Sequence, residues 1–545
     1  MLTIREQIDA QARQRGDAAF VIEPESGRAL TFAQLKHGAD ALGVRFDRRG
    51  IARQDKVAFL LDNGAWAVQL LLGIMAAGRV AVPLNAVAGR TQLQYVLDHS
   101  DAELVFVAPR YTDKLNELLA GIERGIEVVE TPPDDGPRWD DSVADNDVST
   151  AAAAADVTAA ADAGDDATDA GADAAPAASP PTQPTESDTA LLLYTSGSTG
   201  LPKGALLSHR AIVSGGRNVV AGHALTAADR ALCVLPVYHI NGAMVTVCAP
   251  LCSGGSVVMP MRFSAAAFWQ LVAAHRCTWS SVVPTIINYL LDRVAQGEEK
   301  MAFGDDPRLQ QFRFGRSASA PLPAAVLREW ERVFGAPMIE TLGLTETAGT
   351  VASNPLPPGV RKVDSVGIAC GNAIAILDSD GRQLAAGARG EIAIRGRNLL
   401  DEYYKNEEAT RAAFAGDWFR SGDLGHLDAD GYLFITGRLK ELIIRGGENI
   451  APREIDDALY RHPAVLEAAA VGVAHPDYGQ EVAACVALRD GFNCTARALM
   501  DFCAQSVGEV KAPKAVYFLD ELPKGPSGKI LRLKLPEIID SLNES

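Results

Sequence analysis

The sequence has few cysteines, and they follow no recognised pattern. Eight cysteines occur in 545 residues, without a C-x-x-C pair or a Cys/His cluster of metal-ligand spacing. This excludes a disulfide framework and a structural zinc site, and it predicts a protein of the reducing cytoplasm. Charged residues, Gly, Pro or His interrupt the longer apolar stretches, and residues 1–7 lack the apolar segment of a signal peptide. We therefore expect no membrane span.

An excess of basic charge is also missing. The formal net charge of −18 argues against a nucleic-acid-binding protein that neutralises phosphates. Fourteen acidic residues and the single Arg138 give residues 134–188 a net charge of −13, which leaves −5 for the rest of the chain. This stretch is rich in Ala, Asp, Thr and Pro, and Trp139 is its one aromatic residue. We predict a disordered acidic insert.

Several common catalytic motifs are absent. The chain contains no G-x-S-x-G, H-E-x-x-H or G-x-G-x-x-G sequence. The readings as an α/β-hydrolase, a zinc protease or a dinucleotide-binding enzyme therefore lack support.

Strand and helix patterns alternate over residues 1–133. Residues 56–60 and 102–107 are predicted strands, and residues 65–77 are a predicted helix. This β-α-β order predicts an α/β fold, with mostly parallel sheets flanked by helices. The last 105 or so residues alternate shorter helices and strands, which predicts a small α+β domain.

A glycine-rich and hydroxyl-rich loop follows the predicted strand at residues 190–193. Residues 194–204 read Y-T-S-G-S-T-G-L-P-K-G. Glycines allow a tight turn with exposed N–H groups, hydroxyls donate hydrogen bonds, and a lysine adds positive charge, so the loop suits phosphate binding. Because its lysine lies between Pro202 and Gly204, the loop is not a Walker P-loop. The expected phosphate-binding residues are Thr195, Ser196, Gly197, Ser198, Thr199, Gly200 and Lys203.

A second chemical signal lies at residues 338–346, where a predicted strand leads to Gly343 and then to Thr345 and Glu346. A hydroxyl next to a carboxylate suits a Mg²⁺–phosphate contact, because Mg²⁺ binds a few carboxylate oxygens together with substrate phosphates.

These motifs, with three more further along, resemble the ordered motifs of the adenylate-forming superfamily, which includes the acyl-CoA synthetases. The resemblance covers nearly the whole chain except the acidic insert. It implies that Thr345 contacts the α-phosphate and that Glu346 binds Mg²⁺. It also implies that Asp423 of S-G-D and Arg438 bind the ribose, and that Lys529 of P-K-G-P-S-G-K is the adenylation lysine.

The resemblance also implies the domain organisation. Residues 1–437 would form the large domain, residues 438–440 a hinge centred on Lys440, and residues 441–545 a small mobile domain. A hinge needs residues at the end of an element that absorb a backbone rotation. Gly446 and Gly447 match the stretch that forms the pantetheine tunnel for CoA.

The expected acyl pocket contains His239, from a motif that resembles P-x-[F/Y/H]-H-x-x-G, and Arg316, Ser317, Ala318 and Gly349. Arg316 could instead be a solvated or ion-paired cation. Tyr238 and His239 supply no carboxylate for an α-amino group, so a free amino acid is an unlikely substrate. Gly349 stands where similar oxalate-activating ligases place a histidine, and Leu342 replaces the family's usual tyrosine over adenine. Aliphatic, dicarboxylic and aromatic acids all remain open.

We therefore predict an ATP-dependent, Mg²⁺-requiring carboxylate–CoA ligase. It would form an acyl-adenylate with release of pyrophosphate, and then an acyl-CoA thioester with release of AMP. One alternative is an acyl-AMP ligase that loads an acyl carrier protein. Another is an inactive binding protein that retains the fold.

Overall fold

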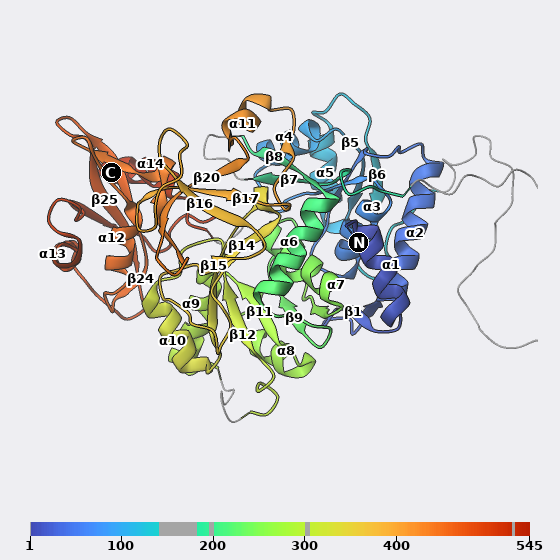
Figure 1. Cartoon of the computed structure of the whole chain (residues 1–545), viewed down its shortest axis with the longest axis horizontal. Helices are drawn as coiled ribbons and strands as arrows, with labels where there is room; N and C mark the ends of the chain where they lie inside the picture. The colour runs from blue at the N-terminus through green and yellow to red at the C-terminus, as the bar shows by residue number, and fades with distance from the viewer. Residues whose placement is uncertain (1, 141–182, 196–200, 300–305, 526–528, 545) are drawn as a thin grey trace, which may run out of the picture.

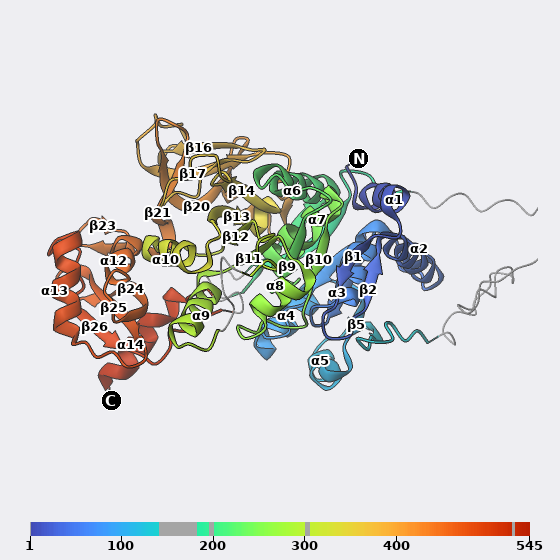
Figure 2. The same cartoon turned by 90° about the horizontal axis from the view of Figure 1, so that it is seen from below.

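The structure is a computed structural model that describes residues 2–140, 183–195, 201–299, 306–525 and 529–544. A large body contains most of the chain, and the C-terminal residues form a smaller lobe at one end (Figure 1). Helices α9 (Pro284–Ala295) and α10 (Ala324–Phe334) lie on the side of the body that faces this lobe (Figure 2). The predicted α/β body with a separate small domain is confirmed.

One large sheet of the body has the strand order β15-β14-β13-β12-β11-β9-β10-β1-β2. The strands from β1 to β13 along this order pair in parallel, whereas β2, β14 and β15 form antiparallel edges. The strands are β1 (Ala19–Ile22), β2 (Ala29–Thr31), β9 (Arg230–Cys233), β10 (Ser256–Val258), β11 (Trp279–Val282), β12 (Phe314–Ser317), β13 (Met338–Leu344), β14 (Gly349–Ser353) and β15 (Ile368–Ala369). Helices α1 (Ile4–Arg15), α6 (His209–Gly222), η3 (Asn241–Cys248, a π-helix), α7 (Ala249–Ser253) and α8 (Phe268–His275) occur in the same part of the body.

A second sheet has the order β18-β8-β7-β4-β3-β5-β6 and is parallel from β7 to β6. Its strands are β3 (Lys56–Leu60), β4 (Val80–Pro83), β5 (Ala102–Val107), β6 (Glu127–Glu130), β7 (Thr189–Thr195), β8 (Lys203–Ser208) and β18 (Glu402–Tyr403). The associated helices are α2 (Phe32–Arg48), α3 (Ala65–Ala76), α4 (Arg90–His99), η1 (Pro109–Tyr111), α5 (Thr112–Leu119) and α11 (Glu407–Ala412). Helix α3 is buried on nearly all sides, which explains its almost uninterrupted apolar sequence.

A third sheet departs from the predicted mostly parallel arrangement. It has the order β16-β17-β20-β19, with β21 paired to β20, and every pairing is antiparallel. Short turns join β19 to β20 and β20 to β21, and such turns can connect only antiparallel neighbours. The strands are β16 (Ala373–Leu377), β17 (Gly390–Arg395), β19 (Phe414–Ala415), β20 (Trp418–Leu427) and β21 (Leu433–Arg438).

The lobe contains a sheet in the order β23-β22-β25-β24, and β26 adds in parallel to β25. Apolar side chains are buried in separate clusters that include residues of both β24 and β25, which is how a sheet covered by helices is stabilised. The elements are β22 (Ile443–Arg445), β23 (Glu448–Ile450), α12 (Pro452–Leu459), β24 (Val465–His475), β25 (Gly479–Leu488), α13 (Ala496–Val507), β26 (Ala515–Phe518), η6 (Arg532–Lys534) and α14 (Leu535–Glu544). The alternating short helices and strands expected over the last 105 or so residues are present, and they include the strand pair β22–β23 and the terminal helix α14.

Local sequence signals fix the starts of the first two helices. Thr3 and Thr31 each accept a hydrogen bond from the backbone of the third helical residue, and that residue's side chain returns a bond to the cap. These capping boxes satisfy N–H groups that have no partner inside the helix.

The ends of the predicted acidic insert are folded, so its boundaries of 134 and 188 are too wide. Trp139 packs edge-on against Phe106, with 5.4 Å between ring centroids, and Arg49 lies over its ring. At the other end Asp188 pairs with Arg53. A single tryptophan therefore anchors residues that their composition assigns to a disordered segment, and residues 141–182 lie outside the described structure.

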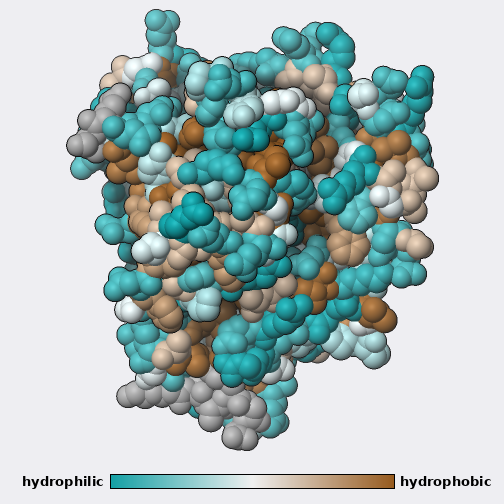
Figure 3. Space-filling view, turned by 90° about the vertical axis from the view of Figure 1, so that its left-hand side faces the viewer, coloured by the Kyte–Doolittle hydropathy of each residue, from teal (hydrophilic) through white to brown (hydrophobic). Residues whose placement is uncertain are grey.

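The outer face of the lobe is dominated by hydrophilic residues, with hydrophobic ones scattered between them (Figure 3). Within the described residues, no helix has the length and apolar character needed to cross a bilayer.

Candidate active site

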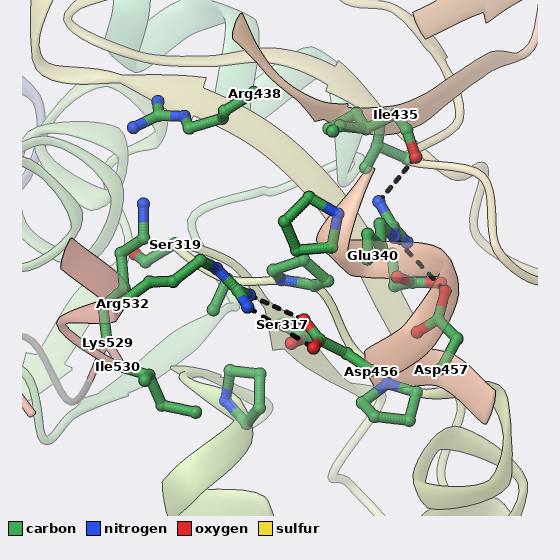
Figure 4. A pocket seen from close by; sticks show the side chains of 18 of the residues that line it. Ser317, Ser319, Glu340, Ile435, Arg438, Asp456, Asp457, Lys529, Ile530 and Arg532 are labelled. Atoms are coloured by element: carbon green, nitrogen blue, oxygen red, sulfur yellow. Dashed lines mark hydrogen bonds and ion pairs between the residues drawn. The ribbon is translucent and has the colours of Figure 1, made fainter. Parts of the chain in front are cut away.

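The body and the lobe enclose a cavity of about 200 Å³ between them. Residues from the body and from the lobe line its wall together (Figure 4). The body contributes Ser317, Ser319, Glu340, Thr341, Leu342, Gly343, Asp423 and Arg438, among others, and the lobe contributes Arg453, Asp456, Asp457, Lys529 and Arg532. The cavity thus joins residues almost 250 positions apart in the sequence.

Lys529 reaches this cavity from the C-terminal tail. Its side chain extends toward the end of the cavity where Arg438 lies (Figure 4). Burial, with a smaller effect of Arg438, lowers the pKa of Lys529. Burial and the neighbouring Arg438 cation disfavour the charged form of Lys529. An anion that entered the cavity would compensate for both and would therefore be bound favourably by the ammonium group.

The tail loop that carries Lys529 is anchored on both sides. The backbone N–H of Gly525 donates to the carbonyl of Lys529 over 2.8 Å, and Lys524 pairs with Glu467 at 2.9 Å. Beyond Lys529, Arg532 pairs with Asp456 at 2.6 Å. These contacts hold the lysine at a fixed place on the lobe, and the sequence reasoning did not identify them.

Asp423 and Arg438 are brought together by the antiparallel sheet. They are directly opposite each other on β20 and β21, and Arg438 Nε lies 2.5 Å from Asp423 Oδ1. Asp423 is buried and lines the cavity. The Asp423 carboxylate raises the pKa of Arg438, which keeps the guanidinium charged. A carboxylate beside a cation is well suited to accept hydrogen bonds from sugar hydroxyls.

Leu342 and Gly343 line the cavity from strand β13. Leu342 is buried and offers an apolar surface where the family's tyrosine would offer an aromatic one. Gly343 is packed so closely that an added Cβ would lie 2.5 Å from the carbonyl oxygen of Gly349. Glu340, two residues before Leu342, also lines the cavity, and burial raises its pKa to about 8.

Thr345 and Glu346 follow β13 in the short 3-10 helix η4 (Thr345–Thr347) and are half-buried. Glu346 accepts a 2.8 Å hydrogen bond from the Tyr403 hydroxyl. Lys203 places its ammonium 4.9 Å from the centre of the same Tyr403 ring. The lysine that ends the predicted phosphate loop is therefore close to the predicted metal ligand, and Tyr403 links them.

The phosphate loop itself is described only at its ends. Thr195 ends β7 and Lys203 begins β8, and the two residues are paired across the antiparallel ladder. The predicted donors Ser196, Gly197, Ser198, Thr199 and Gly200 lie outside the described residues.

Glu346 is compatible with a role as a magnesium ligand. Its carboxylate already has one oxygen fixed by Tyr403. The described residues contain no cluster of three or more His, Cys, Asp or Glu side chains that could hold a metal by themselves. One or two carboxylates combined with substrate phosphates are, however, a common way of binding Mg²⁺.

The predicted acyl-pocket residues surround the π-helix η3. His239 lies just before it, and its enclosed Nε2 atom has no hydrogen-bond partner among the described residues; burial lowers the pKa of His239 to about 4. Arg316 donates hydrogen bonds to Asn241, Ser281 and Thr350. Arg316 is 1% exposed and forms these bonds with neutral groups, so the alternative of a solvated or ion-paired cation is wrong among the described residues. Ser317 and Ala318 follow it at the end of β12, and Gly349 begins β14.

Of the described residues, Lys440, Gly446 and Gly447 are not among those that line the cavity, whereas Arg438 at the start of the hinge is. Lys440 is in the 3-10 helix η5 (Leu439–Glu441), directly after β21. Gly446 and Gly447 form the exposed turn between β22 and β23, with φ angles of 57° and 87°. Such angles are strained for residues that carry a Cβ, which accounts for the two glycines.

Comparison with known proteins identifies the family of the chain. The family model described as "AMP-binding enzyme" matches residues 8–404, and that of the "AMP-binding enzyme C-terminal domain" matches residues 454–529. A sulfoacetate–CoA ligase of Cupriavidus necator is 46% identical over 98% of this chain and 97% of its own. An oxalate–CoA ligase of Arabidopsis thaliana is 36% identical over 92% of each chain. ATP-bound MatB from Rhodopseudomonas palustris superimposes with a TM-score of 0.83 at 28% identity, covering 99% of both chains.

A nucleotide-binding body with a small lobe whose lysine enters the shared cavity defines an adenylate-forming enzyme. The chain belongs to the AMP-binding enzyme family. Its activity is the ATP-dependent joining of a carboxylate to CoA through an acyl-adenylate, with Mg²⁺ accompanying ATP.

Proposed function

We propose that the chain activates a small carboxylic acid in the cavity between body and lobe, with Lys529 as the catalytic lysine. The observation that carries this proposal is that Lys529, Asp423 and Arg438 line one cavity although they come from the tail and from the third sheet. The relatives that activate sulfoacetate and oxalate support a small acid as substrate. The need for ATP and CoA supports action in the cytoplasm.

The chemistry requires alignment and charge neutralisation more than proton transfer. A carboxylic acid with a pKa of about 4 is already ionised at neutral pH, so no general base is needed for its attack on the α-phosphorus. Lys529 would hold the attacking carboxylate and the α-phosphate together, and Thr345 would donate to the same phosphate. Lys203, at the start of β8, would neutralise the departing pyrophosphate.

Glu346, held by Tyr403, would bind the Mg²⁺ that accompanies ATP. The metal supplies charge neutralisation for the phosphates when it is bound. Asp423 and Arg438 would fix the ribose, and Leu342 would cover the adenine.

For the second half-reaction we propose a rotation of the lobe about Lys440. It would withdraw Lys529 and bring Gly446 and Gly447 to the body, where the exposed turn would leave room for the pantetheine arm. His239 stays neutral at physiological pH because of its burial, so it would act as an uncharged gate between the acyl group and the incoming thiol.

The test is to replace Lys529 by Ala and to measure the two half-reactions separately. ATP–pyrophosphate exchange with a panel of carboxylic acids should be abolished, whereas thioester formation from supplied acyl-adenylate and CoA should persist. Lys534→Ala is the matched control, because Lys534 lies on the same tail and is exposed. Equal loss of both half-reactions in Lys529→Ala would contradict the role of the lysine.

The acceptor is tested with the wild-type chain. Free CoA should be acylated, and activity confined to a phosphopantetheinyl carrier protein would overturn CoA as the acceptor. Absence of exchange with every acid would favour an inactive binding protein.

A further inference from the structure

Arg316 is a buried cation without an acidic partner. Its guanidinium donates to Asn241 Oδ1 over 3.2 Å and to Ser281 Oγ and Thr350 Oγ1 over 2.8 Å each. All three acceptors are neutral, and no carboxylate among the described residues forms an ion pair with Arg316. Burial lowers its pKa to about 9, so it remains charged at neutral pH. A buried charge left unpaired costs several kcal/mol, which requires an explanation.

Polar atoms beside Arg316 also have no acceptor. Arg316 Nε and Asn241 Nδ2 are enclosed donors without a hydrogen-bond partner in the described part of the chain. Asn241 is itself held through its Oδ1 by Arg316 and Ser281, so both donors belong to one connected group. Buried donors are normally satisfied. An oxygen-rich anion would satisfy both of them and would neutralise the guanidinium.

This cluster lies next to the place where the substrate carboxyl must react. Arg316 precedes Ser317, which lines the nucleotide cavity, and Asn241 is two residues after His239. Thr341 on β13 also lines the cavity, and its hydroxyl donates to the carbonyl of Ser317 over 3.2 Å. The residue that carries the cation is therefore the neighbour, along β12, of a residue in the cavity wall.

The neutral hydrogen bonds also orient the guanidinium. Ser281 comes from β11, Thr350 from β14 and Asn241 from η3, so three elements fix the plane of the fork. A purely structural buried arginine would also need acceptors, and what sets Arg316 apart is the Nε donor that these anchors leave without a partner among the described residues. A fixed planar fork is the arrangement that recognises a carboxylate or a similar anion through two parallel hydrogen bonds.

We propose that Arg316, held by Asn241, Ser281 and Thr350, binds a second anionic group of the substrate. The chain then activates short acids that carry a carboxylate or sulfonate in addition to the reacting carboxyl. This inference rests on the proposed function, because it places the substrate in the acyl pocket of a carboxylate–CoA ligase. It adds the residue that selects the acid.

The experiment compares two series of acids with the full-length enzyme, ATP, Mg²⁺ and CoA. The dianionic series is sulfoacetate, malonate and oxalate, and the monoanionic series is acetate, propionate and butyrate. Wild-type kcat/KM should be at least about 100-fold higher for the best dianion than for any monoanion, as expected when a site's buried polar groups are left unpaired by an analogue. The separate dianions show whether sulfonate or carboxylate is preferred.

Arg316→Met removes the charge with little change in length, and Arg316→Lys keeps the charge without the planar fork. Arg316→Met should lower kcat/KM for the dianions by about 100-fold, mainly through KM, and should leave the monoanions unchanged or improved. For Arg316→Lys, kcat/KM with the dianions should lie between the values for wild type and Arg316→Met. This variant replaces Arg316→Met in the comparison if the methionine variant does not fold. Arg262→Met, at an exposed position, is the control that should behave as wild type.

Two outcomes overturn the inference while the proposed function stands. One is a wild-type enzyme that prefers monoanionic acids, and the other is an equal loss for both series in Arg316→Met, which would assign Arg316 a purely structural role. Absence of ATP–pyrophosphate exchange with every acid would instead overturn the proposed function, and the inference would fall with it.

Discussion

The ion pair between Arg532 and Asp456 offers a quantitative test of how Lys529 is positioned. Arg532 Nη2 lies 2.6 Å from Asp456 Oδ2, with side-chain exposures of 15% and 11%. Arg532 also contacts Glu441 at 3.3 Å, and Asp456 Oδ1 accepts a 2.7 Å hydrogen bond from the backbone N–H of Ala470. Arg532→Met removes the cation and leaves the aspartate buried.

The expected loss is about 3–5 kcal/mol in the stability of the lobe, the usual cost of removing one partner of a buried pair. The loss should depend on pH. Burial raises the pKa of Asp456 even with Arg532 present, and the variant should raise it further. A carboxyl with a folded-state pKa above its unfolded-state value of about 3.9 favours the folded state below that value. Stability of Arg532→Met should therefore fall as pH rises through the folded-state pKa of Asp456.

Hydrogen exchange of the Ala470 amide in the full-length chain measures this effect without requiring two-state unfolding. Protection should drop in Arg532→Met, and more at pH 8 than at pH 5. The double variant Asp456→Asn with Arg532→Met should recover much of it, because no unpaired charge remains. ATP–pyrophosphate exchange should fall with the lobe's stability, since Arg532 follows Lys529 by three residues.

The matched control is Arg497→Met, which breaks the exposed pair between Arg497 and Asp501 on α13. Such surface pairs contribute little. The reasoning would be refuted if Arg532→Met changed protection no more than Arg497→Met, or if the double variant were as unstable as the single one.

Three further predictions follow from the site. Tyr403→Phe removes the hydrogen-bond donor to Glu346. It should raise the Mg²⁺ concentration needed for half-maximal exchange by about tenfold, which corresponds to the loss of one hydrogen bond to a charged group. An unchanged Mg²⁺ dependence would contradict this role of Tyr403. Gly349→Ala should destabilise the chain by about 1–3 kcal/mol in chemical denaturation, because Gly349 has φ of 107°, whereas Gly125→Ala, where an added Cβ meets nothing within 4 Å, should not. Burial lowers the pKa of His239 to about 4, so the folded state holds the neutral imidazole. The contribution of His239 to folding stability is present above its unfolded-state pKa of about 6.5 and is lost as pH falls through 4. The stability of His239→Gln in denaturation experiments should therefore depend less on acid pH, and an identical dependence would exclude this contribution.

The motifs were sufficient to select residues that the structure brings to one cavity. Asp423 and Arg438 are 15 residues apart in the sequence and face each other across one strand pair. Lys529 is far from both in the sequence, yet it lines the same cavity. Short motifs were sufficient here because the groups with a chemical role, such as a carboxylate or a lysine, lie within the motifs themselves.

The residues that hold these groups in place could not be predicted in the same way. Arg532 and Asp456 are ordinary charged residues in the sequence, and their pairing depends on the packing of α12 against β24. Trp139 anchors a segment whose composition indicates disorder. Composition is an average over many residues, so it does not reveal the contact made by a single side chain. Arg316 had no predicted partner, since its acceptors come from three separate elements.

The contacts between body and lobe are compatible with the proposed rotation of the lobe. Arg453 donates to the carbonyl of Ile435 over 2.8 Å, and Arg489 pairs with Asp292 at 2.9 Å. Both sides of the second pair are about one-third exposed, and exposed ion pairs contribute about 0–1 kcal/mol each. If such contacts hold a closed state, the exchange of one bound ligand for another would be sufficient to open it. A ligand shifts a two-state equilibrium when its binding free energies to the two states differ by a few kcal/mol. The buried Arg532–Asp456 pair lies wholly within the lobe, so in the proposed rotation Lys529 would keep its support and would return to the same place when the lobe closes.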